Sequence, residues 1–475
     1  MTLTRRRPDD SRAARLWTCG AVAFCLFLVF NSNLRSINSI DTAAAQHTAL
    51  ALARTGRADL ALFPGLVKNG IADGYIRVVD GRPYSSYPLL PALLAAPAYR
   101  VAIALDFVDV TNAEPWRVET IGALVASTFV ALACGIVFLV VAGRHGNGPA
   151  ALVAIACGLA TPLWSSASQA LWSHAPAVLL LAAGLGLLMA APAGARERPR
   201  LLLIAGAALT LAVFCRQLLI VFPACAALAL WRSQAPRSCI LMFIAGSALA
   251  AGTMVTTNLL LLGSPLGALV ELYVTGVTTD THAVASAWSG NWLAGLAGVF
   301  VSPSRGLMIY MPIVLVAMGG AAVAWRDPLA RYGLVLPTVL YLVLWSKYAV
   351  WWSGHSFGPR FAADLAVPFA LLAAGTVAYW AASTALTRMV TTAALAWSVM
   401  IQAVGAFAYP AGDWNGLPLN VDLTHDRLWD WRDSQLIRTV RSGTYRHYRA
   451  MQQRNNDPLA ETETIVEIDQ QSPMP

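Results

Sequence analysis

Asp41 is the first residue in the sequence whose type and position could support catalysis. It lies in Ser39-Ile40-Asp41-Thr42, soon after an apolar run, and begins a segment that extends from Ala43 to Arg54. A carboxylate in that position can accept a proton from a hydroxyl nucleophile. Aspartate is also favoured as the N-cap of a helix, and Gly56 follows where a C-cap glycine would lie. Both roles stay open, because one carboxylate can serve each in different hydrogen-bonded states.

Arg216 is the second candidate, because it interrupts a run that is otherwise apolar. It follows Phe214-Cys215 inside residues 201–231. A charge near the centre of a bilayer costs about 2.5–3.5 kcal/mol on insertion scales, so such residues are rare and usually functional. If the run is a hairpin, Arg216 lies near its outer tip and can contact a lipid phosphate. The alternative is a snorkelling surface charge.

Five more polar residues lie between apolar runs, several of them beside tryptophans. The alternative for each is a solvated loop residue. What favours a function is that all are predicted on the same side of the membrane as Asp41. The tryptophans fit an interfacial aromatic belt, and they could equally stack on sugar rings. The five candidates are His174, Arg305, Lys347, His355 and Arg360.

The composition defines the environment in which these residues act. Of 475 residues, 57% are hydrophobic and 12% are charged, whereas soluble domains carry about 25% charged residues. Apolar runs long enough to cross a bilayer recur, which predicts an all-α polytopic membrane protein. The net charge of +8 comes from short basic clusters between these runs and from isolated loop charges. It therefore indicates membrane topology and no nucleic-acid partner.

About eleven spans are predicted, and the positive-inside rule orients them. The N-terminus and the basic clusters, beginning with Arg144-His145, lie in the cytoplasm, and the C-terminus lies outside. Residues 201–231 are counted as two short spans that meet near Arg216, with one tilted helix as the alternative. The spans are 16–31, 118–143, 148–164, 174–193, the two within 201–231, 238–262, 307–325, 332–348, 361–382 and 389–408.

Three regions follow from this topology. Residues 1–15 form a cytoplasmic N-terminus, residues 16–408 the transmembrane domain with a first outer loop at 32–117, and residues 409–475 an extracytoplasmic tail. Segment 87–107 is predicted to be a juxtamembrane or re-entrant helix, because a span there would move most later basic clusters outside. The end of the tail, from Asn456, is acidic and polar and is predicted to be disordered.

Motifs for other chemistries are missing. The sequence has no Walker loop, GxGxxG fingerprint or HExxH element, which disfavours nucleotide binding and zinc proteolysis. The predicted cytoplasmic loops are too short to hold a nucleotide-binding domain. The seven cysteines lie in or beside apolar runs without a CxxC pair, so they are interpreted as buried hydrophobic residues.

In several of these motifs the sequence resembles the GT-C superfamily, the polytopic glycosyltransferases that use polyprenyl-phosphate-linked sugars. It is similar in particular to bacterial relatives of the protein O-mannosyltransferases and of the aminoarabinose transferase that modifies lipid A. Many members carry an Asp-Glu pair in the first outer loop, whereas Asp41 is followed here by Thr42. The resemblance covers nearly the whole chain and rests on the order of its motifs. These are Asp41, Tyr87-Pro88-Leu89-Leu90-Pro91, Arg216, Ser302-Pro303-Ser304-Arg305-Gly306-Leu307 and Gly354-His355-Ser356-Phe357-Gly358-Pro359-Arg360.

The resemblance implies an enzyme that moves a sugar from a polyprenyl-phosphate donor to a hydroxyl on the outer face of a bacterial inner membrane. Asp41 would be the base, and the anomeric carbon would be inverted. Cationic side chains would stabilise the phosphate leaving group. Such a leaving group requires no metal, and no metal or other cofactor is expected. The implied substrate-binding residues are Tyr87, His174, Arg216, Arg305, Lys347, His355 and Arg360.

Two alternatives from other classes stay open: a lipid or glycolipid transporter, and a non-catalytic cell-envelope assembly protein. Transporters often show paired half-repeats and polar groups at mid-membrane. No repeat is visible in this sequence, and its polar candidates lie on one predicted side, which favours the enzyme. The sequence identifies neither the sugar nor the acceptor, which can be a lipid, a glycan or a protein.

Overall fold

The computed structural model describes most of the chain, in ranges with short gaps. The first seven residues and the end of the tail that was predicted to be disordered, from Asn456, lie outside the described residues. The described ranges are 8–35, 37, 39–72, 75–108, 113–190, 199–267, 277–279, 282–284 and 288–444.

Helices make up nearly all the regular structure in these ranges. The exceptions are two hairpins, β1 (Ile76–Val79) with β2 (Arg82–Ser85), and β3 (Val277–Thr279) with β4 (His282–Val284). The predicted all-α polytopic class is confirmed. Within the described chain, six stretches are by length and composition able to cross a membrane: Arg12–Asn31, Pro115–His145, Arg237–Leu262, Pro328–Lys347, Arg360–Ala378 and Ala385–Ala408. Further apolar helices are shorter, so the count of eleven spans stays a prediction.

Residues 40–104 fold into a unit that we call the cap. Its helix α2 ends at Gly56, whose φ of 71° is left-handed and whose N–H donates to the Leu52 carbonyl, as predicted for a C-cap. Within segment 87–107 a single helix, Leu89–Ala104, packs along α2, and its Ala95 and Tyr99 are buried in a cluster shared with α2 and α5. The cap comprises α2 (Ile40–Thr55), α3 (Pro64–Ala72), β1, β2 and α4 (Leu89–Ala104).

The helices of the first half pack closely through small residues. Added Cβ atoms at Gly206 and Gly246 would lie 2.1 Å and 1.9 Å from the carbonyl oxygens of Phe243 and Leu203, so α8 and α10 touch backbone to backbone. This close approach is typical of helices packed in membranes. The helices are α1 (Pro8–Asn31), α5 (Pro115–His145), α6 (Asn147–Leu159), α7 (His174–Ala190), α8 (Pro199–Cys215), α9 (Val221–Arg232) and α10 (Arg237–Leu262).

The second half repeats this mode of packing. An added Cβ at Gly320 of α14 would lie 1.7 Å from the Leu372 carbonyl oxygen of α17. Short 3-10 and π segments interrupt the helices here. The elements are α12 (Trp292–Val301), α13 (Leu307–Tyr310), α14 (Ile313–Ala324), α15 (Pro328–Ala330), η5 (Arg331–Val335), α16 (Leu336–Lys347), η6 (Arg360–Leu365), α17 (Ala366–Ala378), η7 (Trp380–Ala382), α18 (Ala385–Ala408), η8 (His425–Trp429) and α19 (Gln435–Arg441).

The break predicted near Arg216 is present in the structure, and the predicted span 148–164 is interrupted as well. Segment 201–231 is interrupted at Arg216, whose extended backbone (φ −145°, ψ 104°) separates α8 from η4 (Gln217–Ile220) and α9. Segment 148–164 is helical only to Leu159 and is followed by a π turn, η1 (Leu163–Ala167), after Pro162. Proline removes a backbone donor and clashes with the preceding turn, which accounts for the second break.

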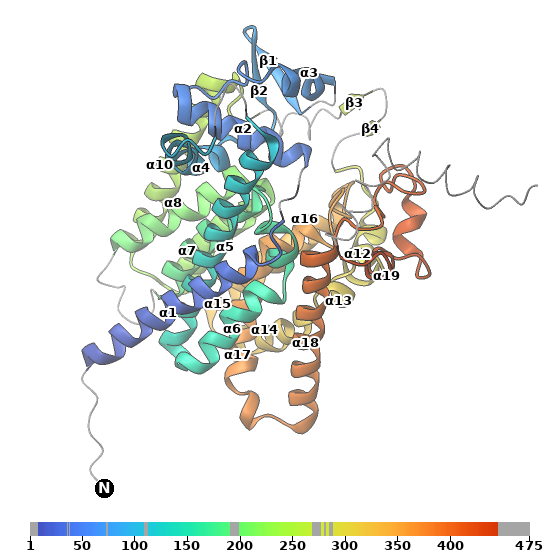
Figure 1. Ribbon diagram of the computed structural model, residues 1–475. Coiled ribbons are helices and arrows are strands. Elements are labelled where there is room, and N and C mark those ends of the chain that lie inside the picture. Colours follow the sequence, from blue (N-terminus) through green and yellow to red (C-terminus); the bar gives the residue numbers. More distant parts are fainter. Residues whose placement is uncertain are drawn as a thin grey trace, which may run out of the picture.

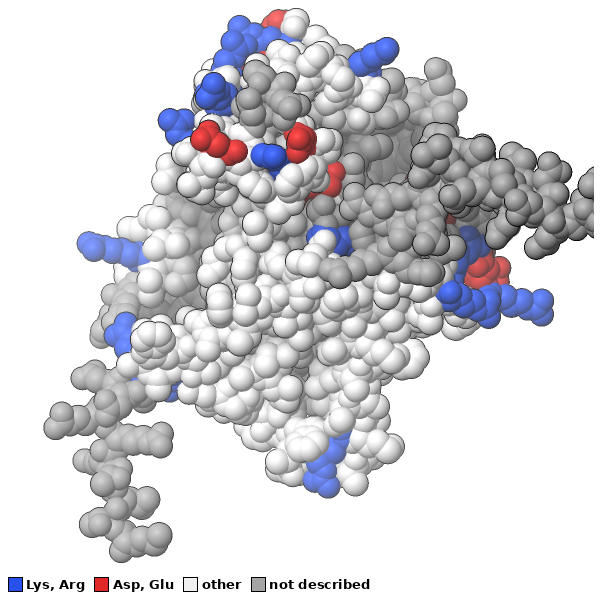
Figure 2. All heavy atoms as spheres, viewed as in Figure 1, with Lys and Arg blue, Asp and Glu red and all other residues white. Residues whose placement is uncertain are grey.

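The cap and the turn between α17 and α18 lie at opposite ends of the molecule (Figure 1). The amino-terminal end of α1 points toward the end that carries that turn. Figure 2 shows charged side chains over the cap and a few basic ones toward the opposite end, with a largely uncharged surface between them. This distribution matches a helical bundle that crosses a membrane beneath a polar cap.

Candidate active site

A cavity of about 280 Å³ lies where the cap meets the helices, and five of the predicted site residues line it. They come from five separate places in the chain: the first turn of α2, the residue before Pro88, the first residue of α7, the break after α8 and the first residue of η6. These residues are Asp41, Tyr87, His174, Arg216 and Arg360.

The Asp41 carboxylate is held by two other cavity residues. Its Oδ1 accepts a hydrogen bond of 2.5 Å from the Tyr87 hydroxyl, and its Oδ2 accepts one of 3.0 Å from Nη1 of Arg360. The N-cap of α2 is Ser39, so the capping alternative for Asp41 is wrong. Within the first turn the negative charge still complements the helix dipole. The Asp41 side chain is 32% exposed, so a substrate hydroxyl can approach it.

Arg360 connects Asp41 to an aromatic wall. Its guanidinium lies 4.2 Å from the ring centre of Trp172, and its Nη2 donates to the Ser353 carbonyl at 3.1 Å. The Nε of Arg360 and the indole Nε1 of Trp172 are buried without a hydrogen-bond partner among the described residues. A buried N–H group without a partner is costly, so these two donors are unusual features of the wall that Arg360 and Trp172 form.

Arg216 is held by a carboxylate that sequence reasoning missed. Its Nε donates to Oδ2 of Asp364 at 3.0 Å, and its guanidinium lies 4.7 Å from the ring centre of Phe361. Asp364 is fully buried, and it also accepts hydrogen bonds from His174 Nδ1 at 2.7 Å and from the Tyr341 hydroxyl at 2.6 Å. The sequence does carry a signal for Asp364, because it is a charge inside the apolar segment 361–382, as Arg216 is inside 201–231.

Three predicted substrate-binding residues do not line this cavity. Lys347 is exposed and donates to the Gly290 carbonyl at 2.9 Å. His355 faces the chain that follows α18. Arg305 is 1% exposed, and its guanidinium donates to backbone and amide oxygens around it. These oxygens belong to Ser304, Trp352, Gly354, Asn415 and Gln435. Burial lowers the pKa of Arg305 to about 10, which leaves the guanidinium charged at neutral pH.

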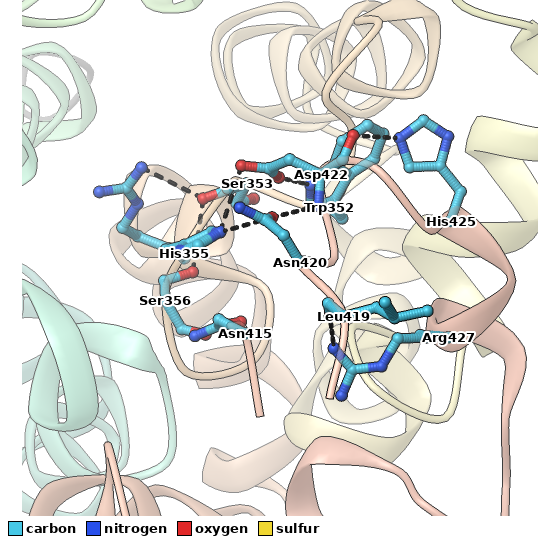
Figure 3. A network of polar contacts seen from close by, with 12 residues as sticks. Trp352, Ser353, His355, Ser356, Asn415, Leu419, Asn420, Asp422, His425 and Arg427 are labelled. Atoms are coloured by element: carbon cyan, nitrogen blue, oxygen red, sulfur yellow. Dashed lines mark hydrogen bonds and ion pairs between the residues drawn. The ribbon is translucent and has the colours of Figure 1, made fainter. Parts of the chain in front are cut away.

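We call residues 409–444 the docked tail, because they pack on the loop that leads to Arg360. In Figure 3 the Trp352 indole points at Asp422, and His355 faces Asn420 and Asp422. The distances are 2.6 Å from Trp352 Nε1 to Asp422 Oδ1 and 3.3 Å from His355 Nε2 to Asp422 Oδ2. The docked tail thereby holds the loop from residue 352 to residue 358 against the cavity wall.

The contact between His355 and Asp422 shifts the pKa of both side chains. The hydrogen bond to Asp422 raises the pKa of His355, and burial opposes it. Burial raises the pKa of Asp422, but the hydrogen bonds from His355 and Trp352 outweigh it and lower that pKa overall. Both shifts favour a charged pair in the docked tail.

The loop contains the spacing Gly354-His355-Ser356-Phe357-Gly358, which has the G-x-S-x-G pattern of a serine nucleophile elbow. That motif requires a turn between a strand and a helix, whereas this segment joins α16 to η6. The Ser356 hydroxyl is buried and lies 3.4 Å from the carbonyl oxygens of Ser353 and Gly358. Ser356 therefore contributes to loop structure and is not placed as a nucleophile.

A second, larger cavity of about 910 Å³ adjoins the first and is mostly apolar. The two share Tyr87 and Pro88 in their walls. Its other walls come mainly from α8, η4, α9 and α10, with Val213, Phe214, Ile220, Ala248, Val255 and Leu344 among them. Within the described chain, no group of three or more His, Cys, Asp or Glu side chains could hold a metal ion.

The fold and the two cavities define a polytopic helical membrane protein with a charged chamber beside an apolar one. No family model matches the chain, and no curated protein matches it. Among solved structures, it is similar to ArnT from Cupriavidus metallidurans bound to undecaprenyl phosphate, at 13% identity over 82% of this chain and 75% of that one, with a TM-score of 0.48. It is also similar to the Archaeoglobus fulgidus oligosaccharyltransferase in complex with Zn and sulfate, at 13% identity and a TM-score of 0.49. That match covers 87% of this chain and 57% of the archaeal one, so the chain spans little more than half its length.

Proposed function

We propose that the protein is an inverting glycosyltransferase that moves a sugar from a polyprenyl-phosphate donor to a hydroxyl acceptor. The observation that carries this proposal is the joining of a carboxylate and two guanidinium groups in one cavity that adjoins a long apolar cavity. A sugar phosphate linked to a lipid needs both environments side by side. We place the reaction at the extracytoplasmic face of a bacterial inner membrane, with the N-terminus in the cytoplasm and the C-terminal tail outside.

Asp41 serves as the general base in this proposal. Its carboxylate takes the proton from the acceptor hydroxyl as that oxygen attacks the anomeric carbon. The bond between the anomeric carbon and the phosphate oxygen breaks, and the lipid phosphate leaves with the electron pair. Attack from the face opposite the phosphate inverts the configuration. Tyr87 holds Oδ1 of Asp41 and so keeps the carboxylate in place.

Arg216 and Arg360 stabilise the leaving phosphate. Guanidinium groups match the geometry of phosphate oxygens and stay charged when partly buried. Both side chains are largely buried, at 13% and 11% exposed, where their interaction with a phosphate is weakly screened. Because the two guanidinium groups can supply this stabilisation, the proposal invokes no metal.

The apolar cavity accommodates the first part of the lipid chain. Its walls contain Val213, Phe214 and Val255, and burial of each isoprene unit there is favourable in proportion to its area. Since Tyr87 and Pro88 border both cavities, the phosphate joins the lipid to the sugar at that boundary.

The test is sugar transfer in membranes from a panel of polyprenyl-phosphate hexoses and pentoses. Asp41→Asn should lower transfer by about 10²–10⁴-fold, the usual contribution of a general base. Asp80→Asn is the matched control, because Asp80 is an exposed cap residue whose positive φ asparagine tolerates. Wild-type transfer by Asp41→Asn at normal protein levels would contradict the proposal.

The same assay separates the two alternatives. An enzyme releases free polyprenyl phosphate together with a new glycoside, whereas a lipid or glycolipid transporter leaves the sugar on its lipid. A non-catalytic assembly protein in purified form transfers no sugar either, and unlike a transporter it does not move the intact donor across a membrane.

A further inference from the structure

The Asp364 carboxylate is the centre of a buried polar cluster, of which the proposed reaction uses only Arg216. It accepts hydrogen bonds from three groups that come from different elements of the fold. These are His174 Nδ1 at 2.7 Å from α7, Arg216 Nε at 3.0 Å from the break after α8, and the Tyr341 hydroxyl at 2.6 Å from α16. Two of the three, His174 and Arg216, line the cavity.

The charges around His174 determine its protonation. Asp364 carries one negative charge, and Arg216 already forms an ion pair with it. Arg360 adds a second cation at the same cavity. The Tyr341 hydroxyl donates a hydrogen bond to Oδ2 of Asp364 and so already stabilises part of its negative charge. An imidazolium would be a third cation around a single buried carboxylate, while the neighbouring ring of Phe361 offers no charge. His174 is therefore a neutral imidazole.

The hydrogen bond to Asp364 then fixes the tautomer. An ionised carboxylate only accepts hydrogen bonds, so the proton of a neutral imidazole must lie on Nδ1. This leaves a lone pair on Nε2, for which the described residues supply no hydrogen-bond partner. His174 lines the cavity although its side chain is only 2% exposed. Functional histidines are often oriented in this way, by a carboxylate that accepts a hydrogen bond from the ring nitrogen that does not act on the ligand.

We infer that His174, oriented by Asp364, accepts a hydrogen bond through Nε2 from a hydroxyl of the bound sugar. This inference rests on the proposed glycosyl transfer. Arg216 and Arg360 can only donate, so a phosphate binds to them, whereas the Nε2 lone pair repels phosphate oxygen and attracts a hydroxyl. His174 thereby contributes to sugar specificity, and Asp364 is a positioning residue that sets both the imidazole tautomer and the place of Arg216.

The tautomer can be measured without any substrate. Nitrogen NMR of histidine-labelled full-length protein in nanodiscs distinguishes the Nδ1–H and Nε2–H tautomers and the imidazolium. The His174 signal is the one absent from His174→Phe. At neutral pH it should be the Nδ1–H tautomer, and Asp364→Asn should change it, because the asparagine amide can donate to the ring. Tyr341→Phe removes a donor from the same carboxylate and should leave the tautomer unchanged. An imidazolium or an Nε2–H tautomer in the wild-type protein would overturn the inference.

The hydroxyl contact is tested with monodeoxy analogues of whichever panel donor is transferred. For the wild-type protein, removal of one particular hydroxyl should lower kcat/KM by about tenfold or more, the effect of leaving one buried acceptor without its partner. The His174→Phe protein should transfer that analogue with the same kcat/KM as it transfers the full sugar. If every analogue shows equal losses in both proteins, His174 contacts no sugar hydroxyl. A protein without any transfer activity would refute the proposed function. The tautomer measurement uses no substrate, so it would still test separately whether Asp364 orients His174.

Discussion

Replacing Arg305 with methionine should release the docked tail from the loop that leads to Arg360. The buried guanidinium joins the two parts of the chain. On one side it donates to the carbonyl oxygens of Trp352 and Gly354, at 2.8 Å and 3.3 Å, and on the other to Asn415 at 2.8 Å. Gln435, at the start of α19, accepts a further hydrogen bond.

The size of the effect follows from these contacts. Hydrogen bonds to a charged group contribute about 1.5–3 kcal/mol each, and a buried acceptor left without its donor costs about 1–3 kcal/mol. Removal of a buried cation also removes its desolvation cost, which offsets part of the loss. Methionine keeps most of the packing volume against Trp414, over whose ring the guanidinium lies at 5.2 Å. We expect a net loss of about 3–5 kcal/mol in the local stability of the docked tail.

Hydrogen exchange of α19 measures this loss directly. A change of 3 kcal/mol corresponds to about 100-fold faster exchange when opening is local. Arg432→Met is the matched control, because Arg432 is an exposed arginine of the same tail. Equal exchange in Arg305→Met and wild-type protein, together with lost sugar transfer, would refute this reasoning and assign Arg305 a direct role with substrate.

Four further predictions concern other parts of the molecule. The His355–Asp422 pair should protect the docked tail from exchange most strongly between the lowered pKa of Asp422 and the raised pKa of His355; protection falls as pH rises through the latter, and His355→Gln should remove that dependence. Tyr87→Phe should lower sugar transfer about tenfold through loss of its hydrogen bond to Asp41, measured as initial rates at matched protein levels. Gly358→Ala should lower the free energy of unfolding in detergent by about 2–4 kcal/mol, because the φ of Gly358 is +58° and a Cβ would lie 2.4 Å from the Tyr310 ring. Gly148→Ala is the control and should leave the stability unchanged, because its Cβ would meet open space. Ala248→Trp, in the apolar cavity, should weaken use of long-chain donors more than short-chain ones, while Leu249→Trp on the exposed face of α10 should have no such effect.

Long apolar runs allowed accurate prediction of the helices. The predicted segments 238–262 and 389–408 correspond to α10 (Arg237–Leu262) and α18 (Ala385–Ala408). Shorter helices were harder, because an apolar residue that faces protein looks the same in sequence as one that faces lipid. The helix α12 has 10 residues and was not predicted, since it is too short for the span criterion of about 20 residues.

The site residues could be predicted by type but not by pairing. A charge that interrupts an apolar run identified Arg216, and the same signal at Asp364 was overlooked. Partners could not be read from the sequence, since Arg360 is 319 residues from Asp41 and Asp364 is 190 residues from His174. The burial of Arg305 depends on how the docked tail folds back, and no local pattern of polar and apolar residues encodes that contact.

The shortness of the helices next to the cavity has a consequence for its depth. Within the described residues, helices α7 and α8 have 17 residues each, so these parts extend about 26 Å, less than the roughly 30 Å of a bilayer's hydrocarbon core. His174 is the first residue of α7, and Arg216 directly follows α8. The irregular segment before α7 is buried in protein, including Ser165, Ser166 and Gln169, as non-helical backbone at membrane depth must be. In the proposed orientation the chamber would therefore lie below the headgroup plane, and we expect the lipid donor to enter it sideways without being lifted out of the membrane.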